Sequence, residues 1–411
     1  MEDLSFTIQQ RKTKTGTNSL ILLPLSIFLL YDFIQLNMMG GMSSFIIDSA
    51  HINSVQFGFA SSLFFYVNLA LLPFSGPMLD KYQPRYLIAL SILISAIGTW
   101  IFAMWPSYIT LLTWRAMAGI CGAFSYLSCV KIVGTYFSRH RIGVLLGLTG
   151  IVIMSAGLID QYPMVTLLKQ IGLISTLQIN ALFGVLVSMI VIMLIRKNTR
   201  HSTLIIEKNT TKTNPYSIFN NWLIALYAAL TNFPLFVLGA VWGNLYLHTA
   251  YHLNISQAAI LTSMIYAGNI LGAPILGFLS DKHMHRKNFM IVSSLIFLVS
   301  LSLIIWLPAS VPLSILYLCV FALGFATGAQ TLAYASIVDI NLPHNIAKAG
   351  SLLSFFSVGS GAICIPLFGL VSGVDKNYQH GMYIVVAAAI ISLLLAIIYI
   401  PNRKGANLFR G

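Results

Sequence analysis

The strongest constraint on this chain is a series of long apolar runs, each long enough to cross a lipid bilayer as a helix. The hydrocarbon core of a bilayer is about 30 Å thick, and about 20 helical residues cross it. Backbone groups find no water there, so such segments fold as helices. Twelve runs have this length: residues 20–40, 56–79, 86–105, 107–130, 142–168, 174–195, 220–247, 257–280, 288–307, 312–336, 346–372 and 380–400. The sequence predicts an all-α integral membrane protein with twelve transmembrane helices.

Composition excludes the main soluble alternatives. Charged residues make up 8% of the chain, whereas ordinary soluble domains carry about 25%. So few charges cannot cover a water-facing surface, which excludes a soluble enzyme, a disordered protein and a nucleic-acid-binding domain despite the net charge of +13. The four Cys residues lie in apolar runs without a Cys-x-x-Cys pair, so we expect no metal site and no cofactor.

The Lys and Arg residues between the runs predict the orientation of the chain in the membrane. Twenty of them fall on the side that carries the N-terminus, whereas Lys169 and Lys376 fall on the opposite side and Arg115 lies within a run. Cytoplasmic loops carry the excess of positive charge. The sequence therefore predicts cytoplasmic N- and C-termini and an even number of spans.

Two copies of one pattern follow the second and the eighth runs. They read Gly76-Pro-Met-Leu-Asp80-Lys81-Tyr-Gln-Pro-Arg85 and Gly277-Phe-Leu-Ser-Asp281-Lys282-His-Met-His-Arg286. Corresponding positions are 201 residues apart (277 − 76 and 286 − 85). This duplication predicts two six-helix bundles of like topology. The predicted organisation is a cytoplasmic tail (1–19), an N-terminal bundle (20–195), a cytoplasmic linker (196–219), a C-terminal bundle (220–400) and a second cytoplasmic tail (401–411).

Both loops resemble the signature loop of the major facilitator superfamily. Trp114-Arg115-Ala-Met-Ala-Gly119 resembles the Arg-bearing motif in that family's fourth helix. The resemblance extends over nearly the whole chain and implies the major facilitator fold and a transporter rather than an enzyme. It also implies a conformational latch on the cytoplasmic side, formed by Asp80, Lys81, Arg85, Asp281, Lys282 and Arg286.

Three further segments carry a finer resemblance. Gly239-Ala-Val-Trp242-Gly243, Asp160-Gln161-Tyr-Pro163 and Val338-Asp339-Ile-Asn341-Leu-Pro343 resemble parts of bacterial permeases of the phagosomal nutrient transporter type. Related members with similar layouts are siderophore permeases. This resemblance implies a multi-pass protein of the bacterial inner membrane. The fifth run lacks the Gly-Pro pair of the superfamily's drug antiporters, which disfavours drug efflux.

Asp32 and Arg115 are ionisable residues inside predicted helices, where each costs about 2.5–3.5 kcal/mol to insert. At about 1.5 Å per residue, Asp32 lies about 18 Å from the inner face and Arg115 about 12 Å from the outer face, which is the same depth in a core about 30 Å thick. The two side chains can therefore pair. The Arg115 guanidinium suits a carboxylate or phosphate of the solute, and Asp32 is a candidate proton carrier. The alternative is a permanent ion pair that never meets solute.

Other polar residues in the runs are weaker candidates. Asp160, followed by Pro163, lies near the outer end of the fifth run and is a second candidate for proton coupling; the alternative is a solvated residue at the membrane edge. Neutral polar and aromatic side chains would complete the substrate site, although each also suits an ordinary interhelical contact. They are Tyr31, Gln35, Tyr66, Tyr126, Asn232, Trp242, Tyr266, Asn269 and Gln330.

These features together predict a secondary transporter that works by alternating access, with protons as a possible co-substrate. The chain carries no nucleotide-binding loop, so ATP is not expected to supply the energy. The expected solute is a small polar molecule, in the first place one that bears a carboxylate, with uptake preferred over export. An amino acid, a small peptide or a nucleoside fits the finer resemblance. A permease for a polycarboxylate siderophore is the first alternative, and a transporter-like sensor is an alternative of another class. We expect a monomer whose partners are the solute and the lipid bilayer.

Overall fold

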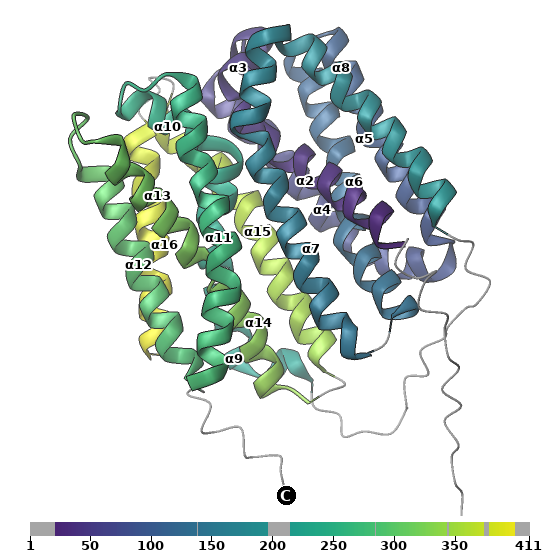
Figure 1. Ribbon diagram of the computed structural model, residues 1–411, viewed down its shortest axis with the longest axis vertical. Helices are drawn as coiled ribbons and strands as arrows, with labels where there is room; N and C mark the ends of the chain where they lie inside the picture. The colour runs from purple at the N-terminus through teal and green to yellow at the C-terminus, as the bar shows by residue number, and fades with distance from the viewer. Residues whose placement is uncertain are drawn as a thin grey trace, which may run out of the picture.

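The computed structural model describes residues 21–137, 139–195, 214–283, 285–342, 345–373 and 378–398. The predicted tails, residues 196–213 of the predicted linker and Lys376 lie outside these ranges. Within them, all regular elements are helices (Figure 1). In chain order they are α2 (Leu22–Gly41), α3 (Ser43–Ala50), α4 (Ser54–Lys81), α5 (Pro84–Met104), α6 (Tyr108–Tyr136), α7 (Arg139–Asp160), α8 (Tyr162–Leu194), η2 (Pro215–Ser217), α9 (Phe219–Pro234), the π-helix η3 (Leu235–Trp242), α10 (Gly243–Ala250), α11 (Ile255–His283), α12 (Arg286–Trp306), α13 (Leu313–Thr327), α14 (Gln330–Ile340), α15 (Ile346–Ser372) and α16 (Tyr378–Ile398).

The helices form two halves that lie side by side, α2–α8 and α9–α16 (Figure 1). In the first half α4 packs on α6 and α5 on α8, and in the second half α11 packs on α13 and α12 on α16. The halves meet where α4 packs on α15 and where α2 packs on η3. This arrangement agrees with the duplication that the sequence predicts.

Helix directions define two ends of the molecule. One end, which we call the motif side, carries residues 80–85 around the junction of α4 and α5 and residues 281–286 around the junction of α11 and α12. The opposite end, which we call the far side, carries α3 and α10, at the top of Figure 1. The first described helix begins on the motif side and the last one ends there, because α2 reaches α10 at its C-terminal end and α16 begins beside the start of α4.

Eleven segments among the described residues are long and apolar enough to cross a bilayer, against the twelve runs that the sequence predicts. The difference arises because Gly147–Leu194, 48 residues long, counts as one segment. The chain breaks its helical path twice in that segment, after Asp160 and at Gly172 (φ 80°). Ser188 then donates to the Ala89 carbonyl (3.0 Å), near the motif-side start of α5. The chain therefore reverses direction within this segment.

The predicted boundary of the fifth run is wrong. The sequence places it at residue 168, whereas α7 ends at Asp160 and a new helix begins at Tyr162. Pro163 stands in the first turn of α8, where a missing backbone N–H costs nothing because that position has no helical acceptor. Pro163 therefore starts a helix and does not loosen one.

The internal repeat extends to the helix caps. The Gln56 backbone N–H donates to the Asn53 side chain (2.8 Å), and the Asn53 N–H donates back to the Gln56 side chain (3.1 Å). Asn254 and Gln257 make the same reciprocal pair at the start of α11, at 2.9 and 3.1 Å. Both pairs are again 201 residues apart. Each is a capping box, which satisfies orphan N–H groups of the first turn.

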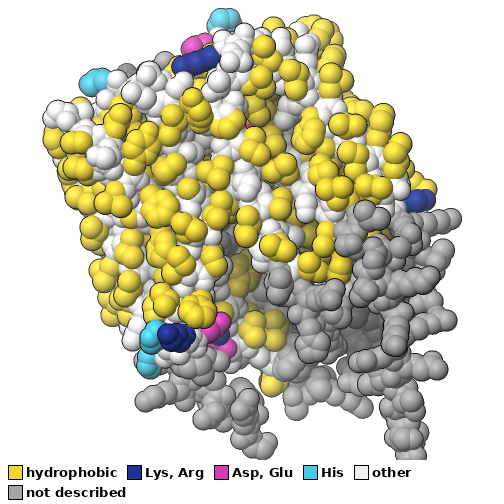
Figure 2. Space-filling model, viewed as in Figure 1, with side chains coloured by type: hydrophobic (Ala, Val, Ile, Leu, Met, Phe, Trp, Pro, Cys, Tyr) yellow, Lys and Arg dark blue, Asp and Glu magenta, His cyan; other side chains and the backbone are white. Residues whose placement is uncertain are grey.

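Apolar side chains dominate the surface between the two ends. On the face shown in Figure 2, a broad hydrophobic zone covers the helices, and charged side chains lie near helix ends. Phe278 (67% exposed) and Leu318 (68% exposed) belong to this exposed apolar surface. Water does not solvate such a surface favourably, whereas the hydrocarbon core of a bilayer does.

Glycine sets the closest helix contact in the second half. A Cβ atom on Gly324 of α13 would lie 2.1 Å from the Ile265 carbonyl oxygen of α11, and one on Gly268 would lie 2.2 Å from the Phe321 carbonyl oxygen. Small residues at such interfaces let two backbones approach closely, which is how helices associate in lipid.

We expect Gly324→Ala to destabilise the protein by about 1–3 kcal/mol, because the new methyl group meets backbone that must move. A lower thermal unfolding midpoint in detergent is the measurement. Gly359→Ala is the matched control, since a Cβ there meets nothing within 4 Å and Gly359 also lies inside a helix. Equal midpoints for the two variants would contradict the close contact.

Candidate functional site

Arg115 lies at the centre of the first half with its side chain fully enclosed. It projects from α6 and is 0% exposed. One guanidinium nitrogen, Nη1, donates to the Gln35 carbonyl oxygen of α2 (2.6 Å), whereas Nε and Nη2 have no hydrogen-bond partner. The guanidinium carbon lies 5.1 Å from the centre of the Phe64 ring and 5.8 Å from that of Trp114. Aromatic faces stabilise a cation electrostatically, but they do not satisfy its N–H groups.

Asp32 lies on α2, one turn before Gln35, and is 1% exposed. It interacts electrostatically with Arg115, and Ser125 and Cys121 of α6 lie within interaction range of its carboxyl group. Its Oδ1 has no hydrogen-bond partner. The predicted proximity of Asp32 and Arg115 agrees with this arrangement, but the two do not form an ion pair within 4 Å. The permanent brace that the sequence left as an alternative is therefore absent from this conformation.

Gln35 organises the polar core around Arg115. Its side-chain nitrogen donates to the Asn180 oxygen (2.7 Å) and to Tyr31 (2.9 Å), and its side-chain oxygen accepts from Trp114 (2.9 Å). Thr99 of α5 lies in the same network, 3.2 Å from the Gln35 nitrogen. Through these partners Gln35 and Tyr31 hold four helices together and so fix the Gln35 backbone against Arg115. The polar atoms of Gln35 and Tyr31 are used within the protein, whereas Arg115 keeps N–H donors that have no partner.

Three predicted residues of the second half are engaged in structural contacts. The Trp242 N–H donates to the Ile365 carbonyl (3.0 Å), and its ring stacks on Phe368. Tyr266 donates to Asn37 across the two halves (2.8 Å). Asn269 donates to Thr327 (2.8 Å) within the second half. Among the described residues, no hydrogen bond or ring contact joins any of these three side chains to Arg115.

The remaining predicted residues differ in exposure. Tyr66 is 37% exposed beside Phe59, on the face of α4 opposite the buried Phe64, so it does not join the buried group. Tyr126 of α6 (46% exposed) and Tyr334 of α14 are both exposed and interact electrostatically across the two halves. This interaction places the two rings near each other across the halves.

Asn232 and Gln330 lie on the second half. Asn232 is 6% exposed and makes no side-chain hydrogen bond with a described residue. Gln330 is half-buried and donates to Ser357 (3.2 Å). Asn232 stands 200 residues after Asp32, one residue short of the repeat interval of 201, so the second half has a neutral amide close to the level of the carboxyl group in the first half.

Hydrogen bonds between the halves lie on the far side. Among the described residues these bonds join Asn37 to Tyr266 (2.8 Å), Gly40 to Asn244 (3.0 Å), Ser54 to Tyr378 (3.4 Å), Gln161 to Gly239 (2.9 Å) and Lys169 to Ser256 (2.7 Å). Each involves a residue at or near the far-side end of a helix, and Asp160 lies beside them with 0% exposure. The far side is therefore closed. The far-side end of α7 is buried, so the alternative of a solvated Asp160 at the membrane edge does not apply in this conformation.

The motif-side residues form ion pairs within each half. Arg286 pairs with Asp281 (3.1 Å) and with Asp339 (2.5 Å) in the second half. In the first half Asp80 pairs with Lys131 of α6 (2.5 Å), and Arg85 donates to Tyr86. The two copies of the loop thus use different partners, although their sequences correspond. The predicted latch also names Lys81 and Lys282, both of which are exposed.

Sequence reasoning missed several residues of the central cluster. Phe64 and Trp114 face the guanidinium, and Thr99 and Asn180 complete the Gln35 network. Asn180 is a polar residue in an apolar run, which was the signal available for it. Phe64 gave no signal, since an aromatic residue in a transmembrane helix is ordinary.

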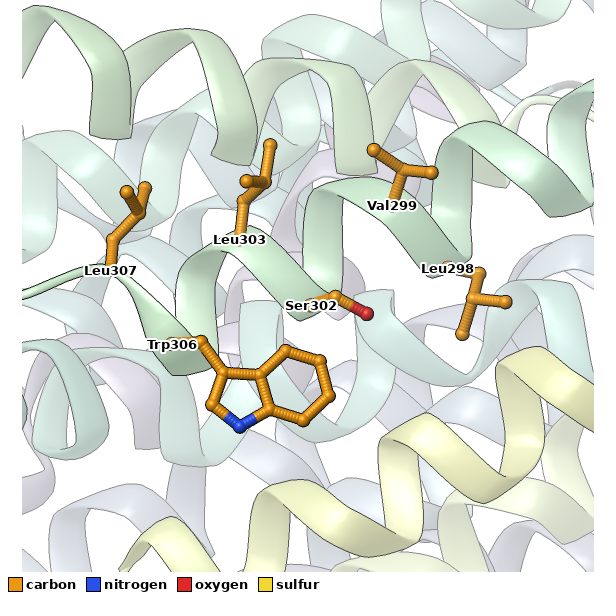
Figure 3. Close-up of a pocket in the computed structure, with 6 residues that line it drawn as sticks. All are labelled: Leu298, Val299, Ser302, Leu303, Trp306 and Leu307. Carbon is orange, nitrogen blue, oxygen red and sulfur yellow. The ribbon is translucent and has the colours of Figure 1, made fainter.

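A surface hollow on α12 lies apart from this cluster (Figure 3). It is lined by Leu298, Val299, Ser302, Leu303, Trp306 and Leu307. All six residues belong to one helix and the residue after it, and three of their side chains are more than 40% exposed to the apolar surroundings. The hollow contains none of the predicted site residues.

Comparisons with known proteins decide the family. The sequence profile of the major facilitator superfamily matches residues 25–249 and 224–409, nearly the whole chain. The chain belongs to the major facilitator superfamily. It is therefore a multi-pass membrane transporter and not an enzyme, as the resemblance implies.

Curated relatives in this superfamily are distant. Myo-inositol transporter 2 of Cryptococcus neoformans var. grubii is 29% identical over 181 residues, which cover 44% of this chain and 30% of the length of that protein. The MFS transporter AsaE of Aspergillus flavus is 22% identical over 341 residues, covering 80% of this chain and 74% of that protein. This chain thus matches less than a third of the inositol transporter's length.

Solved structures share the fold. A bacterial homologue of the human lysosomal transporter Spinster, in an inward-facing and occupied conformation, superposes with a TM-score of 0.76 at 19% identity, covering 96% of this chain and 98% of that one. A mutant form of the nucleoside transporter NupG superposes with a TM-score of 0.73 at 13% identity, covering 92% of this chain and 99% of that one. At these identities the likeness concerns the fold.

Proposed function

We propose that this protein is a secondary active transporter for a small polar solute that bears a carboxylate, such as an amino acid or a small peptide. The observation that carries the proposal is the Arg115 guanidinium, which is 0% exposed and keeps two nitrogens without partners. A buried cation without an ion-pair partner is costly. A carboxylate that binds both free nitrogens would satisfy them together.

Asp32 is the proposed site of proton coupling. Its carboxyl group interacts with Arg115 but makes no ion pair with it, and Oδ1 has no partner. A solute carboxylate on Arg115 would stand near Asp32, and like charges favour the protonated form of one of them. Solute binding and protonation of Asp32 therefore favour each other, which is the requirement for symport.

We also propose twelve crossings with both ends of the described chain in the cytoplasm. The proposal rests on the reversal within Gly147–Leu194 and on an α2 start and an α16 end that share the motif side. Among the described residues, the Lys and Arg residues other than the buried Arg115 lie on the motif side, with the exception of Lys169, which lies on the far side. In this orientation the closed far side is the outer side, and the protein is inward-facing. The bacterial inner membrane remains the expected location.

The relatives suggest competing solutes. One is named as a transporter of myo-inositol and one structural neighbour as a transporter of nucleosides. Both solutes are neutral and present hydroxyl groups. A neutral solute would leave the Arg115 charge uncompensated, so we favour an anionic solute, in keeping with the finer resemblance to nutrient permeases.

Counterflow in proteoliposomes tests the function. Purified full-length protein is reconstituted with a high internal concentration of one unlabelled solute, and entry of a trace of the same labelled solute is followed without any ion gradient. Amino acids, small peptides, nucleosides, myo-inositol and a polycarboxylate siderophore are compared. We expect transient accumulation with at least one carboxylate-bearing solute. Accumulation with myo-inositol or a neutral nucleoside alone would overturn the proposed substrate class, and binding without exchange would favour a sensor.

A further inference from the structure

The far-side seam between the halves contains two reciprocal amide contacts. Asn244 of α10 donates to the Gly40 carbonyl of α2 (3.0 Å), and Gln161 donates to the Gly239 carbonyl of η3 (2.9 Å). The first amide reaches from the second half to the first, and the second reaches the opposite way. The backbones of the two halves lie close together here, because a Cβ on Gly40 of α2 would lie 3.0 Å from the Gly239 carbonyl oxygen of η3. Within the first half, a Cβ on Gly41 would lie 2.2 Å from the Asp160 carbonyl oxygen, so α2 and α7 also touch at this level.

These contacts leave the seam with an excess of acceptors. Both amide nitrogens are used, whereas the side-chain oxygens of Gln161 and Asn244 have no partner, and neither do the two carboxyl oxygens of Asp160. Asp160 and Gln161 are 0% exposed, and Asn244 is 4% exposed. Four buried acceptor oxygens without a donor are costly. One donor added to this group would remove much of that cost.

No neighbouring charge compensates an ionised Asp160. Its helix α7 packs against α2, α6, α8 and α11. Asp32 is the acidic residue of α2 and stands about two turns from Gly40, or about 12 Å. Among the described residues no Lys, Arg or His nitrogen lies within 4 Å of Asp160. The far-side titratable or charged groups of the other elements at the seam are Tyr266 on α11, Tyr108 on α6, Tyr162 and Lys169 on α8, and Tyr246 and His248 on α10.

Two of these groups are already engaged. Tyr266 interacts electrostatically with Asp160, but its hydroxyl donates to Asn37 (2.8 Å). Lys169 donates to Ser256 (2.7 Å). Neither therefore offers Asp160 a donor in the closed seam. In these surroundings an ionised Asp160 has neither a counter-charge nor a hydrogen-bond donor. The neutral acid needs these partners less, so burial favours the protonated form of Asp160.

We propose that Asp160 is a proton-binding lock that closes the far side of this transporter. While the seam is open, a proton from far-side water binds one carboxylate oxygen of Asp160, forming an O–H bond. On closure that O–H donates to one of the unpartnered amide oxygens of Gln161 and Asn244. When the seam opens again, the proton returns to water. Low pH on the far side therefore favours closure, and high pH favours opening.

The enclosed geometry favours a proton over a metal ion as the bound species. The unpartnered oxygens have almost no accessible surface, so no water-sized space adjoins them. A hydrated Na⁺ needs such space, and a dehydrated one needs several oxygens at bonding distance. A proton adds no volume. This inference rests on the alternating-access function proposed above, but it concerns the seam and not the Arg115 site.

Distances across the far side test the lock without any solute. Spin labels are placed on exposed residues of opposite halves, at Gln170→Cys and Ser310→Cys, in a Cys364→Ala background because the other three cysteines are buried. Pulsed electron–electron double resonance in lipid nanodiscs then gives the closed and open populations between about pH 5 and 9. With one proton linked to closure, we expect the closed-to-open ratio to rise up to about tenfold per unit fall in pH.

Variants of Asp160 separate the lock from other effects. Asp160→Asn supplies a permanent donor of the same shape, so we expect a closed far side at all pH values. Asp160→Glu keeps the titration and should keep the pH dependence, as should Asp48→Asn, which alters an exposed acid on α3. A pH dependence that survives in Asp160→Asn would overturn the proposal, and so would a population that responds to Na⁺ instead of pH. Because this measurement needs no transport, a failed counterflow assay leaves its result intact.

Discussion

Replacing Arg115 with Lys lowers uptake of the transported solute by well over tenfold at subsaturating concentration. The variant keeps the positive charge but loses the planar fork that can donate two parallel hydrogen bonds to a carboxylate. It also loses the reach of Nη1 to the Gln35 carbonyl (2.6 Å). Initial uptake rates in proteoliposomes measure the effect, and most of it should be a higher KM, because the lost contacts are made to bound solute.

Lys348→Arg is the matched control for this exchange of cations. Lys348 is exposed at the motif-side start of α15, where neither side chain meets the central cluster. We expect its uptake to equal that of the unaltered protein. If Arg115→Lys also transports normally while eluting as a single species from size-exclusion chromatography, Arg115 is a structural residue and the proposed solute class loses its support.

The fold follows from features that are visible in the sequence. Long apolar runs have a single solution in lipid, because each backbone group must be satisfied within its own segment. The repeated Gly-x-x-x-Asp-Lys pattern, displaced by 201 residues, predicts the two halves, and the cap pairs at Asn53 and Asn254 repeat the same interval. The break after Asp160 leaves little trace in hydropathy, because the polar residues Asp160 and Gln161 interrupt the apolar run only briefly. Pro163, a residue type that favours the first turn of a helix, was the signal available for it.

The central site is less visible in the sequence. Asp32 and Arg115 stand out because charges are rare in an apolar run, and depth along the helix places them at one level. Their missing ion pair is not predictable, because it depends on how α2 and α6 are rotated and on Gln35 occupying Nη1. Likewise Tyr31 and Trp242 have the composition of binding residues, but their polar atoms bond within the protein.

The ion-pair partners of the two repeated loops are likewise not predictable from the spacing of residues in the sequence. Asp80 and Asp281 occupy equivalent positions, yet one pairs with Lys131 and the other with Arg286. Lys131 lies on α6, and the equivalent position in the second half holds Leu332. A duplicated sequence therefore predicts the backbone that it shares better than the contacts of side chains that have since diverged.

Replacing Asp32 with Asn abolishes accumulation driven by a pH gradient while sparing counterflow. Asn has nearly the shape of Asp and can still interact with Ser125 and Cys121, which lie near the carboxyl group, but it neither binds nor releases a proton. A gradient of one pH unit is worth about 1.4 kcal/mol per proton and supports at most about tenfold accumulation. We expect this ratio to fall to simple equilibration in the variant.

Asp48→Asn is the control, since Asp48 is an exposed acid on α3, and its accumulation ratio should be unchanged. Should Asp32→Asn accumulate solute like the unaltered protein, the coupled proton binds elsewhere, and Asp160 becomes the candidate to examine by the same ratio. If instead the variant loses counterflow as well, Asp32 holds the solute or Arg115 in place and is not confined to carrying a proton. The pair of assays thus separates driving force from binding, because counterflow needs a site but no gradient, whereas accumulation needs both.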